Sequence, residues 1–376
     1  MELGQIGWLL AGTIGPAFLV SFLTCFVVRR QAVRWGLLDQ PNHRKVHVTP
    51  TPLGGGIAVW AGVVSVLALS VGGISLLDRD QLAQWLPTFL APHIDGVRYR
   101  ALDVAVLLGG ATALMLLGLA DDRRGLNWKL RLAVQFAVSA LVVIRQGWTL
   151  TAFIPIPLLT TALSVLWIAA LINSFNMLDN MDGLSAGVAA IASAMLAVFL
   201  LFPAVGSTTA PQLFVAGLLL VLVGSLLGFL MHNRPPARLF MGDAGSYFVG
   251  FIVGAATLMA TYTGYNSNDQ HAILAPLCVM AVPFYDMLSV MWIRWRQGRS
   301  VFEADKCHFS HRLVDLGMSK PQAVLTIYLT TATCGLAALL LRRVDMLGAA
   351  IILLLVGCVL LLIHLLESAA RRTREQ

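Results

Sequence analysis

The stretch Asn173-Ser-Phe-Asn-Met-Leu-Asp-Asn-Met-Asp-Gly-Leu184 gathers amides and carboxylates between two apolar runs, 158–172 and 188–202. If the preceding helix continues through it, residues three apart share a face, and that face carries Asn173, Asn176, Asp179 and Asp182. Such a row suits a metal ion or the hydrogen-bonding edge of a base and a sugar. The alternative is a polar loop that ends a helix at Gly183.

The composition is that of a protein that crosses a membrane many times. Hydrophobic residues make up 58% of the chain and charged residues 12%, which is typical of polytopic membrane proteins rather than soluble domains. We expect an all-α fold forming one transmembrane domain over 1–376, with about 11 spans of about 20 residues each. The expected spans are 5–28, 53–76, 102–120, 128–147, 156–175, 184–203, 210–231, 244–262, 272–293, 321–341 and 346–366.

Basic residues are concentrated on one side of the expected bundle. By our count, 20 of the 26 Lys and Arg lie on the side that comprises the tail after 366, the adjoining span ends and the segments 29–52, 121–127, 176–183, 232–243 and 294–320. This asymmetry predicts that these five segments face the cytoplasm, with the N-terminus outside and the C-terminus inside. The net charge of +7 then indicates orientation and anionic partners, and we expect no nucleic acid.

Several acids lie near the expected cytoplasmic ends of spans. Asp121 and Asp122 are adjacent, so on a helix they point about 100° apart and should have different roles. A salt-bridge cluster with the arginines that follow is the alternative. Asp243, between two glycines at the start of an apolar helix, is either a ligand-binding residue or a plain N-cap. Asp286 lies inside a span, where a carboxylate is functional by default or makes a structural hydrogen bond.

Two loops on the basic side carry cations suited to phosphates. The first, 38–56, contains Lys45 and His47 among prolines and glycines, and glycine exposes backbone N–H groups to a ligand. The second, 294–313, contains His308 and His311, which share a face if the segment is helical. For both loops the alternative is a basic anchor at the membrane surface.

In four segments the chain resembles the family of polyprenyl-phosphate N-acetylhexosamine-1-phosphate transferases, which start peptidoglycan, teichoic-acid and O-antigen synthesis. The segments are, in order, Gly118-Leu-Ala-Asp-Asp122, Asn176-Met-Leu-Asp-Asn-Met-Asp-Gly-Leu184, Phe240-Met-Gly-Asp-Ala-Gly-Ser246 and 308–313. The loop 41–56 also fits. The likeness therefore extends over most of the chain, from about residue 38 to 317.

Two positions depart from the usual pattern of that family. Ser310 stands where members commonly have a histidine, in His-x-His-His-Arg-Leu. Asn180 stands where glycine is usual, in Asp-Gly-x-Asp-Gly. The first departure removes one histidine from the set expected at the donor phosphates, whereas the second leaves both carboxylates in place.

The resemblance implies transfer of a sugar 1-phosphate from a UDP-sugar to polyprenyl phosphate, with release of UMP and with Mg²⁺ or, alternatively, Mn²⁺ as cofactor. It implies that Asp243 binds the metal with Asp122 as a second contact, and that Asp121 orients the lipid phosphate or takes a proton from it. The implied substrate-binding residues are Lys45, His47, Asn176, Asp179, Asp182, Phe240, His308, His311 and Arg312. Direct in-line attack is favoured over a phospho-aspartyl intermediate.

The loop 39–47 and the His-Arg-Leu ending look more like the N-acetylglucosamine-1-phosphate branch than the muramoyl-pentapeptide branch, which is the alternative. The implied location is the bacterial cytoplasmic membrane, with the active site facing the cytoplasm, and a homodimer is a further expectation. The hypothesis from a different class is an ion-coupled transporter, but only Asp286 lies within a span and the two halves show no clear repeat. The intact acids disfavour an inactive scaffold homologue.

Overall fold

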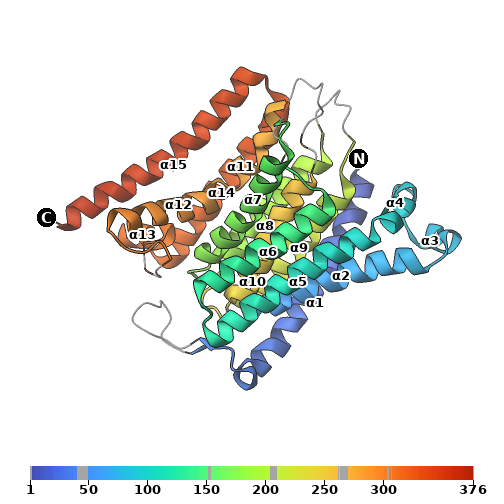
Figure 1. Ribbon diagram of the computed structural model, residues 1–376, viewed down its shortest axis with the longest axis horizontal. Helices are drawn as coiled ribbons and strands as arrows, with labels where there is room; N and C mark the ends of the chain where they lie inside the picture. Colours follow the sequence, from blue (N-terminus) through green and yellow to red (C-terminus); the bar gives the residue numbers. More distant parts are fainter. Residues whose placement is uncertain are drawn as a thin grey trace.

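The structure is a computed structural model that describes residues 2–39, 50–150, 154–203, 210–260, 262, 270–302, 305 and 307–375. Within these residues the fold is helical apart from one two-stranded sheet, which confirms the all-α expectation (Figure 1). The elements are α1 (Leu3–Trp35), β1 (Leu38–Asp39), β2 (Thr51–Pro52), α2 (Gly55–Leu76), α3 (Arg79–Trp85), η1 (Ala91–His93), α4 (Ile94–Tyr99), α5 (Ala101–Arg124), α6 (Trp128–Gln146), α7 (Pro157–Leu178), α8 (Leu184–Leu201), α9 (Leu213–Asn233), α10 (Gly242–Met259), η2 (Gln270–Leu274), α11 (Ala275–Val279), α12 (Ala281–Arg296), α13 (Phe309–Asp315), α14 (Lys320–Leu340), η3 (Leu341–Arg343) and α15 (Met346–Glu375).

The long helices are apolar over lengths that suit a bilayer, which confirms a polytopic membrane protein. Across the described ranges, nine helices could cross a membrane, and a tenth span exists if the pair 270–279 and α12, bent by 62°, is one broken span. The expected span 128–147 is α6, which is not among them, because Lys129, Arg131 and Arg145 shorten its apolar centre. Since α5 and α7 both end beside the start of α10, α6 still runs back along the bundle between them.

The bundle has a buried centre and an exposed rim. The apolar stretches of α8, α9 and α10 are 78%, 72% and 78% buried, whereas that of α15 is 17% buried. Figure 1 shows α15, in red, on one flank with α12 and α14, and α1 and α2, in blue, on the opposite flank. Leu347, Leu354 and Leu362 of α15 are exposed, as expected for side chains that contact lipid.

The stretch 173–184 is not one continuous helix. α7 ends at Leu178, and Gly183 begins α8 with a φ of 76°, a left-handed conformation that glycine adopts readily. The expectation that Asn173 and the acids share one helical face is therefore wrong. Asn and Asp side chains favour turns because they hydrogen-bond to nearby backbone. The intervening segment, Asp179–Gly183, is called the acidic turn below.

Glycines let three helices meet beside the acidic turn. A Cβ added to Gly118 of α5 would lie 2.3 Å from the carbonyl oxygen of Asp243, and one added to Gly56 of α2 would lie 2.1 Å from a backbone nitrogen of α10. The N–H of Gly55 donates to the carbonyl of Phe240 at 2.8 Å. The start of α10 is thus packed directly against the backbones of α2 and α5.

A small sheet joins two further segments at the same place. β1 and β2 are antiparallel, with Leu38 opposite Pro52 and Asp39 opposite Thr51. The N–H of Phe240 donates to the carbonyl of Pro52 at 2.9 Å, which attaches the segment before α10 to β2. Segments 29–52 and 232–243, far apart in sequence, therefore lie side by side.

We predict that Gly118→Ala destabilises the protein, because the new methyl group meets backbone atoms of α10 that cannot rotate away. Overpacking of this kind typically costs about 1–3 kcal/mol. Gly109→Ala is the matched control, since it lies on α5 with no atom within 4 Å of the added Cβ. Melting temperatures of the detergent-solubilised proteins measure the difference. Equal melting temperatures for the two variants would contradict the close approach of α5 and α10.

Candidate active site

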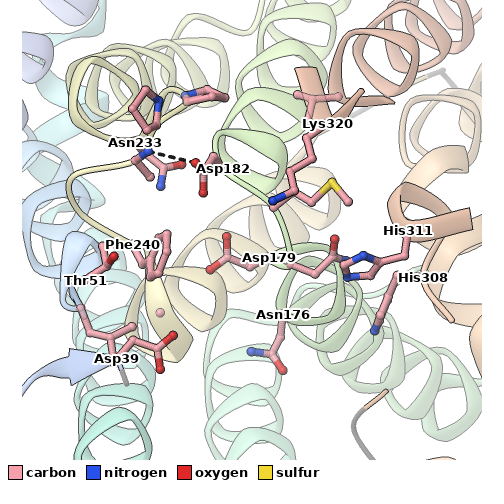
Figure 2. A pocket seen from close by; sticks show the side chains of 18 of the residues that line it. Asp39, Thr51, Asn176, Asp179, Asp182, Asn233, Phe240, His308, His311 and Lys320 are labelled. Atoms are coloured by element: carbon pink, nitrogen blue, oxygen red, sulfur yellow. Dashed lines mark hydrogen bonds between the residues drawn. The ribbon is translucent and has the colours of Figure 1, made fainter. Parts of the chain in front are cut away.

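A cavity of about 850 Å³ lies where these segments meet. Each of the five segments expected to form the site contributes to its lining. Figure 2 shows Asp179 and Asp182 between His308 and His311 on one side and Phe240 on the other. His308 is the N-cap of α13, and His311 lies within that helix. The polar and charged lining residues are Asp39, Thr51, Asp122, Asn176, Asp179, Asn180, Asp182, Asn233, Asp243, Asp305, His308, His311 and Lys320.

Asp122 and Asp243 meet at this cavity although 121 positions separate them. The carboxylate of Asp122 accepts hydrogen bonds from the backbone N–H groups of Asp243 at 2.8 Å and Ala244 at 3.2 Å. Gly242 has a φ of 71°, and a Cβ there would lie 2.5 Å from the Asp122 carboxylate. Asp122 therefore caps the N-terminus of α10, where a negative charge is favourable, and places Asp243 at the cavity.

Asp121 does not line the cavity, in keeping with the different directions of adjacent residues on a helix. Its carboxylate forms an ion pair with Arg131 at 2.5 Å and accepts hydrogen bonds from the Leu126 N–H at 2.6 Å and the Tyr247 hydroxyl at 3.2 Å. Arg131 also lies 3.4 Å from Asp243. This position suits support of Arg131 better than direct contact with a lipid phosphate.

Asn176 lines the cavity, whereas Asn173 joins two helices. The Nδ2 of Asn176 donates to Asp243 Oδ1 at 2.5 Å and to Ser246 Oγ at 3.1 Å. The Nδ2 of Asn173 donates to Gln135 on α6 at 2.8 Å. Asn176 therefore holds the carboxylate of Asp243 in one orientation, and Asn173 is a structural residue.

The acidic turn presents two carboxylates to the cavity. Asp182 accepts a hydrogen bond from the Ala237 N–H at 2.9 Å, which fixes the turn to the segment before α10. Burial, followed by repulsion from Asp122, raises the pKa of Asp179 to about 7. Asp179 therefore exchanges a proton close to neutral pH.

Asp286 of α12 orients one of the histidines. It is fully buried and accepts hydrogen bonds from His308 Nδ1 at 2.9 Å and from the Phe309 N–H at 2.6 Å. A carboxylate that faces Nδ1 keeps the proton on that nitrogen and fixes the orientation of the ring. Asp286 thus makes a structural hydrogen bond that also orients a cavity residue.

Arg312 does not line the cavity and instead anchors α13. Its Nε contacts Glu367 of α15 at 2.8 Å, and a terminal nitrogen donates to Ser289 Oγ on α12 at 2.9 Å. Both partners of the ion pair are buried, and the Tyr285 hydroxyl donates to the same carboxylate at 3.0 Å. Its position suits holding α13 in place better than the expected direct contact with substrate.

Three charged residues of the cavity were not singled out from the sequence: Asp39, Asp305 and Lys320. Arg294 forms a bidentate ion pair with Asp305 at 3.0 and 3.1 Å. Burial alone would raise the pKa of Asp305, but hydrogen bonds from Arg294 and the Cys307 N–H outweigh it and lower the pKa to about 2. Lys320 follows a capping box at Ser319, a signal that marks a helix start and carries no information about a site.

Of the remaining expected residues, Phe240 lines the cavity. Lys45 and His47 lie outside the described residues.

The donors at the cavity fit a magnesium ion shared with substrate. Among the described residues, no group of three or more His, Cys, Asp or Glu side chains is arranged to hold an ion by itself. Magnesium usually takes one or two protein carboxylates and completes its shell with water and substrate phosphates. Asp122 and Asp243 supply two carboxylates side by side, with the Asn176 amide next to them. The cavity can therefore bind phosphates through a cation on one side and histidines on the other.

Known proteins are similar to this chain over most of its length. The family model described as glycosyl transferase family 4 matches residues 104–261. A Bacillus subtilis (strain 168) protein, named probable undecaprenyl-phosphate N-acetylglucosaminyl 1-phosphate transferase, is 31% identical over 87% of this chain and 84% of its own length. The decaprenyl-phosphate N-acetylglucosaminephosphotransferase of Mycobacterium tuberculosis (strain H37Rv) is 35% identical over 83% of this chain and 78% of its own length. The undecaprenyl-phosphate alpha-N-acetylglucosaminyl 1-phosphate transferase of Escherichia coli K12 is 30% identical, with 84% and 79% covered.

We predict that Glu367→Gln and Arg312→Gln lower the melting temperature similarly, because each leaves a buried charge without its counterion. Removing one partner of a buried pair typically costs about 3–5 kcal/mol. The double variant should be no less stable than the single variants. Cys358→Ser, at an exposed position of the same helix, is the control. A large loss for Arg312→Gln beside a stable Glu367→Gln would show that Arg312 has a different partner.

Asp179 should make stability depend on pH. Its folded-state pKa of about 7 lies above the ordinary value of 3.8, so the folded protein holds a proton that the unfolded chain has released across that window. Stability therefore falls as pH rises from about 4 to about 7. Asp179→Asn removes this contribution, and its melting temperature should be close to that of the wild type near pH 4 but exceed it near pH 8. The exposed Asp80→Asn is the control, and parallel pH profiles for wild type and Asp179→Asn would contradict the assignment.

Proposed function

The chain belongs to glycosyl transferase family 4, and on this premise we propose that it transfers N-acetylglucosamine 1-phosphate from a UDP-sugar to a polyprenyl phosphate, releasing UMP. The sugar phosphate and the polyprenyl acceptor come from the names of the relatives. The observation that carries the proposal is that Asp122, Asp243 and the acidic turn line the same cavity as His308 and His311. It lies at one end of the helices, where a soluble donor and a lipid acceptor can meet.

The reaction is attack by a phosphate oxygen of the lipid on the phosphorus that bears the sugar. A P–O bond forms there, the bond to the bridging oxygen breaks, and UMP leaves with that oxygen. A phosphomonoester has a second pKa near ~6, so the acceptor is already largely dianionic at neutral pH and needs no strong base. The cavity therefore has to position the two anions for in-line displacement and screen their repulsion.

Asp243 and Asp122 are the residues that would hold Mg²⁺, with Mn²⁺ as an alternative. The bound ion would neutralise charge on the donor phosphates and on the departing UMP. Asn176 fixes one oxygen of Asp243, and the backbone of α10 fixes Asp122. Arg131 supplies a positive charge beside Asp121 and Asp243, which limits repulsion among the acids when substrate arrives.

The remaining groups divide between the nucleoside and the phosphates of the donor. Asp179 and Asp182 would accept hydrogen bonds from the base and the ribose, since carboxylate oxygens are acceptors for N–H and O–H groups. His308 and His311 would contact the phosphates, and Lys320 adds a cation to the same cavity. Lys45 and His47 are phosphate contacts proposed from the sequence alone.

The cavity is proposed to face the cytoplasm from the inner membrane of a bacterium, because the segments around it hold most of the Lys and Arg. α1 runs from Leu3 toward this side and α15 ends on it, where Glu367 meets Arg312. The N-terminus is therefore proposed to be outside and the C-terminus inside.

We predict that Asp243→Asn reduces UMP release by at least about 100-fold, because a neutral amide replaces a carboxylate that lines the cavity. Asp78→Asn should keep full activity, since Asp78 caps α3 and does not line the cavity. The assay uses purified protein, UDP-GlcNAc, polyprenyl phosphate and Mg²⁺, and chelation with EDTA should stop release reversibly. Equal activity of the two variants would remove Asp243 from the reaction.

The donor is identified by screening UDP-GlcNAc, UDP-GalNAc and UDP-MurNAc-pentapeptide against the same preparation. Release of UMP that requires both the lipid phosphate and UDP-GlcNAc is the expected result. Preference for the pentapeptide donor would instead assign the muramoyl branch. Ion-driven flux into liposomes without UMP release would indicate a transporter.

A further inference from the structure

The two positions at which the chain departs from the usual family pattern are in contact. The hydroxyl of Ser310, on α13, donates a hydrogen bond to the side-chain oxygen of Asn180 in the acidic turn. Ser310 is 1% exposed, and the Nδ2 of Asn180 donates to the Met177 carbonyl at 2.8 Å. Both side chains are therefore held in place, and the contact joins segments 130 positions apart.

The contact joins two elements that face each other across the cavity. The acidic turn carries Asp179 and Asp182, and α13 carries His311 directly after Ser310 (Figure 2). Each element also has anchors of its own. The Ala237 N–H holds the turn through Asp182, and Asp286 and Glu367 hold α13 through His308, Phe309 and Arg312. The bond from Ser310 to Asn180 connects the two anchored elements directly.

The two departures are also complementary in size. A histidine at position 310 would bring a ring to a site where the serine hydroxyl is already buried against Asn180. A glycine at position 180 would remove the amide and leave space on the same side. In this chain the larger residue belongs to the turn and the smaller one to α13. A change at one position alone therefore either opens a gap or creates a clash.

We propose that Asn180 and Ser310 form a positioning pair that sets the separation between the acidic turn and α13, and thereby the fit of the UDP-sugar donor. The inference rests on the function proposed for the same cavity. Neither side chain has to touch the reacting atoms. The hydrogen bond preorganises the carboxylates on one side and the histidines on the other, so that the donor meets a cavity already at the correct width.

The first test is a double-mutant cycle on donor kinetics. Ser310→Ala and Asn180→Ala should each raise KM for UDP-GlcNAc by about 3- to 10-fold, the effect of one hydrogen bond, with little change in kcat. The KM of the double variant should equal that of the single variant with the higher KM, because either substitution alone already removes the hydrogen bond. Ser164→Ala, a buried serine of α7 outside the cavity, should leave KM unchanged.

The second test places the larger side chain at position 310 and the smaller one at position 180. Ser310→His alone should raise KM further and lower the melting temperature, because the ring meets the Asn180 amide. Adding Asn180→Gly should recover most of both losses. Additive effects in the cycle, or a Ser310→His phenotype that is the same with Asn180 and with glycine, would overturn the pair.

Failure of the Asn180–Ser310 inference can be distinguished from failure of the proposed function. Whether the wild type releases UMP tests the function by itself. A double-mutant cycle on the melting temperatures of the same variants needs no substrate. Coupling between positions 180 and 310 should appear in that cycle as well. Absence of coupling in stability and in KM overturns the inference whatever the donor proves to be.

Discussion

The contact between the Asp122 carboxylate and the N-terminus of α10 positions the two acids proposed to bind the metal. Asp122 accepts the first N–H groups of α10, and this joins the end of α5 to the start of α10. The approach is possible because Gly118 and Gly242 leave no side chain between the two helices. Asp243 is placed by that junction, Asn176 then bonds to Asp243, and Arg131 lies between Asp243 and Asp121. The positions of Asp122 and Asp243 at the cavity thus depend on the N-terminal capping of one helix.

Much of the fold could be predicted from the sequence, because hydropathy and charge act over long segments. Apolar runs of about 20 residues locate the helices. The adjacency of Asp121 and Asp122 was enough to predict that they would differ in direction. The few motifs of the family pattern also contain many of the residues that line the cavity. α6 shows the limit of this reasoning, since its Arg131 forms an ion pair with Asp121 of α5, a contact that hydropathy does not reveal.

Side-chain partners could not be predicted, because they depend on packing between distant helices. Arg312 lies in a segment expected to bind phosphate, yet Glu367 is close enough to form an ion pair with it, and no local pattern connects the two. Asn173 has the three-residue spacing of the acids, but the turn after Leu178 ends the helical face they would share. Asp305 has no motif, and it reaches the cavity because Arg294 holds it there. The position of such a side chain thus depends on contacts or chain turns that the short motif around it does not encode.

The ion pair between Arg312 and Glu367 has a mechanical consequence. The apolar stretch of α15 is only 17% buried, so few side chains fix this helix against the bundle. Its C-terminal part is nevertheless joined to α13, the short helix that carries His311, through the buried ion pair. A displacement of α15 would therefore be transmitted through Glu367 and Arg312 to a helix that lines the cavity.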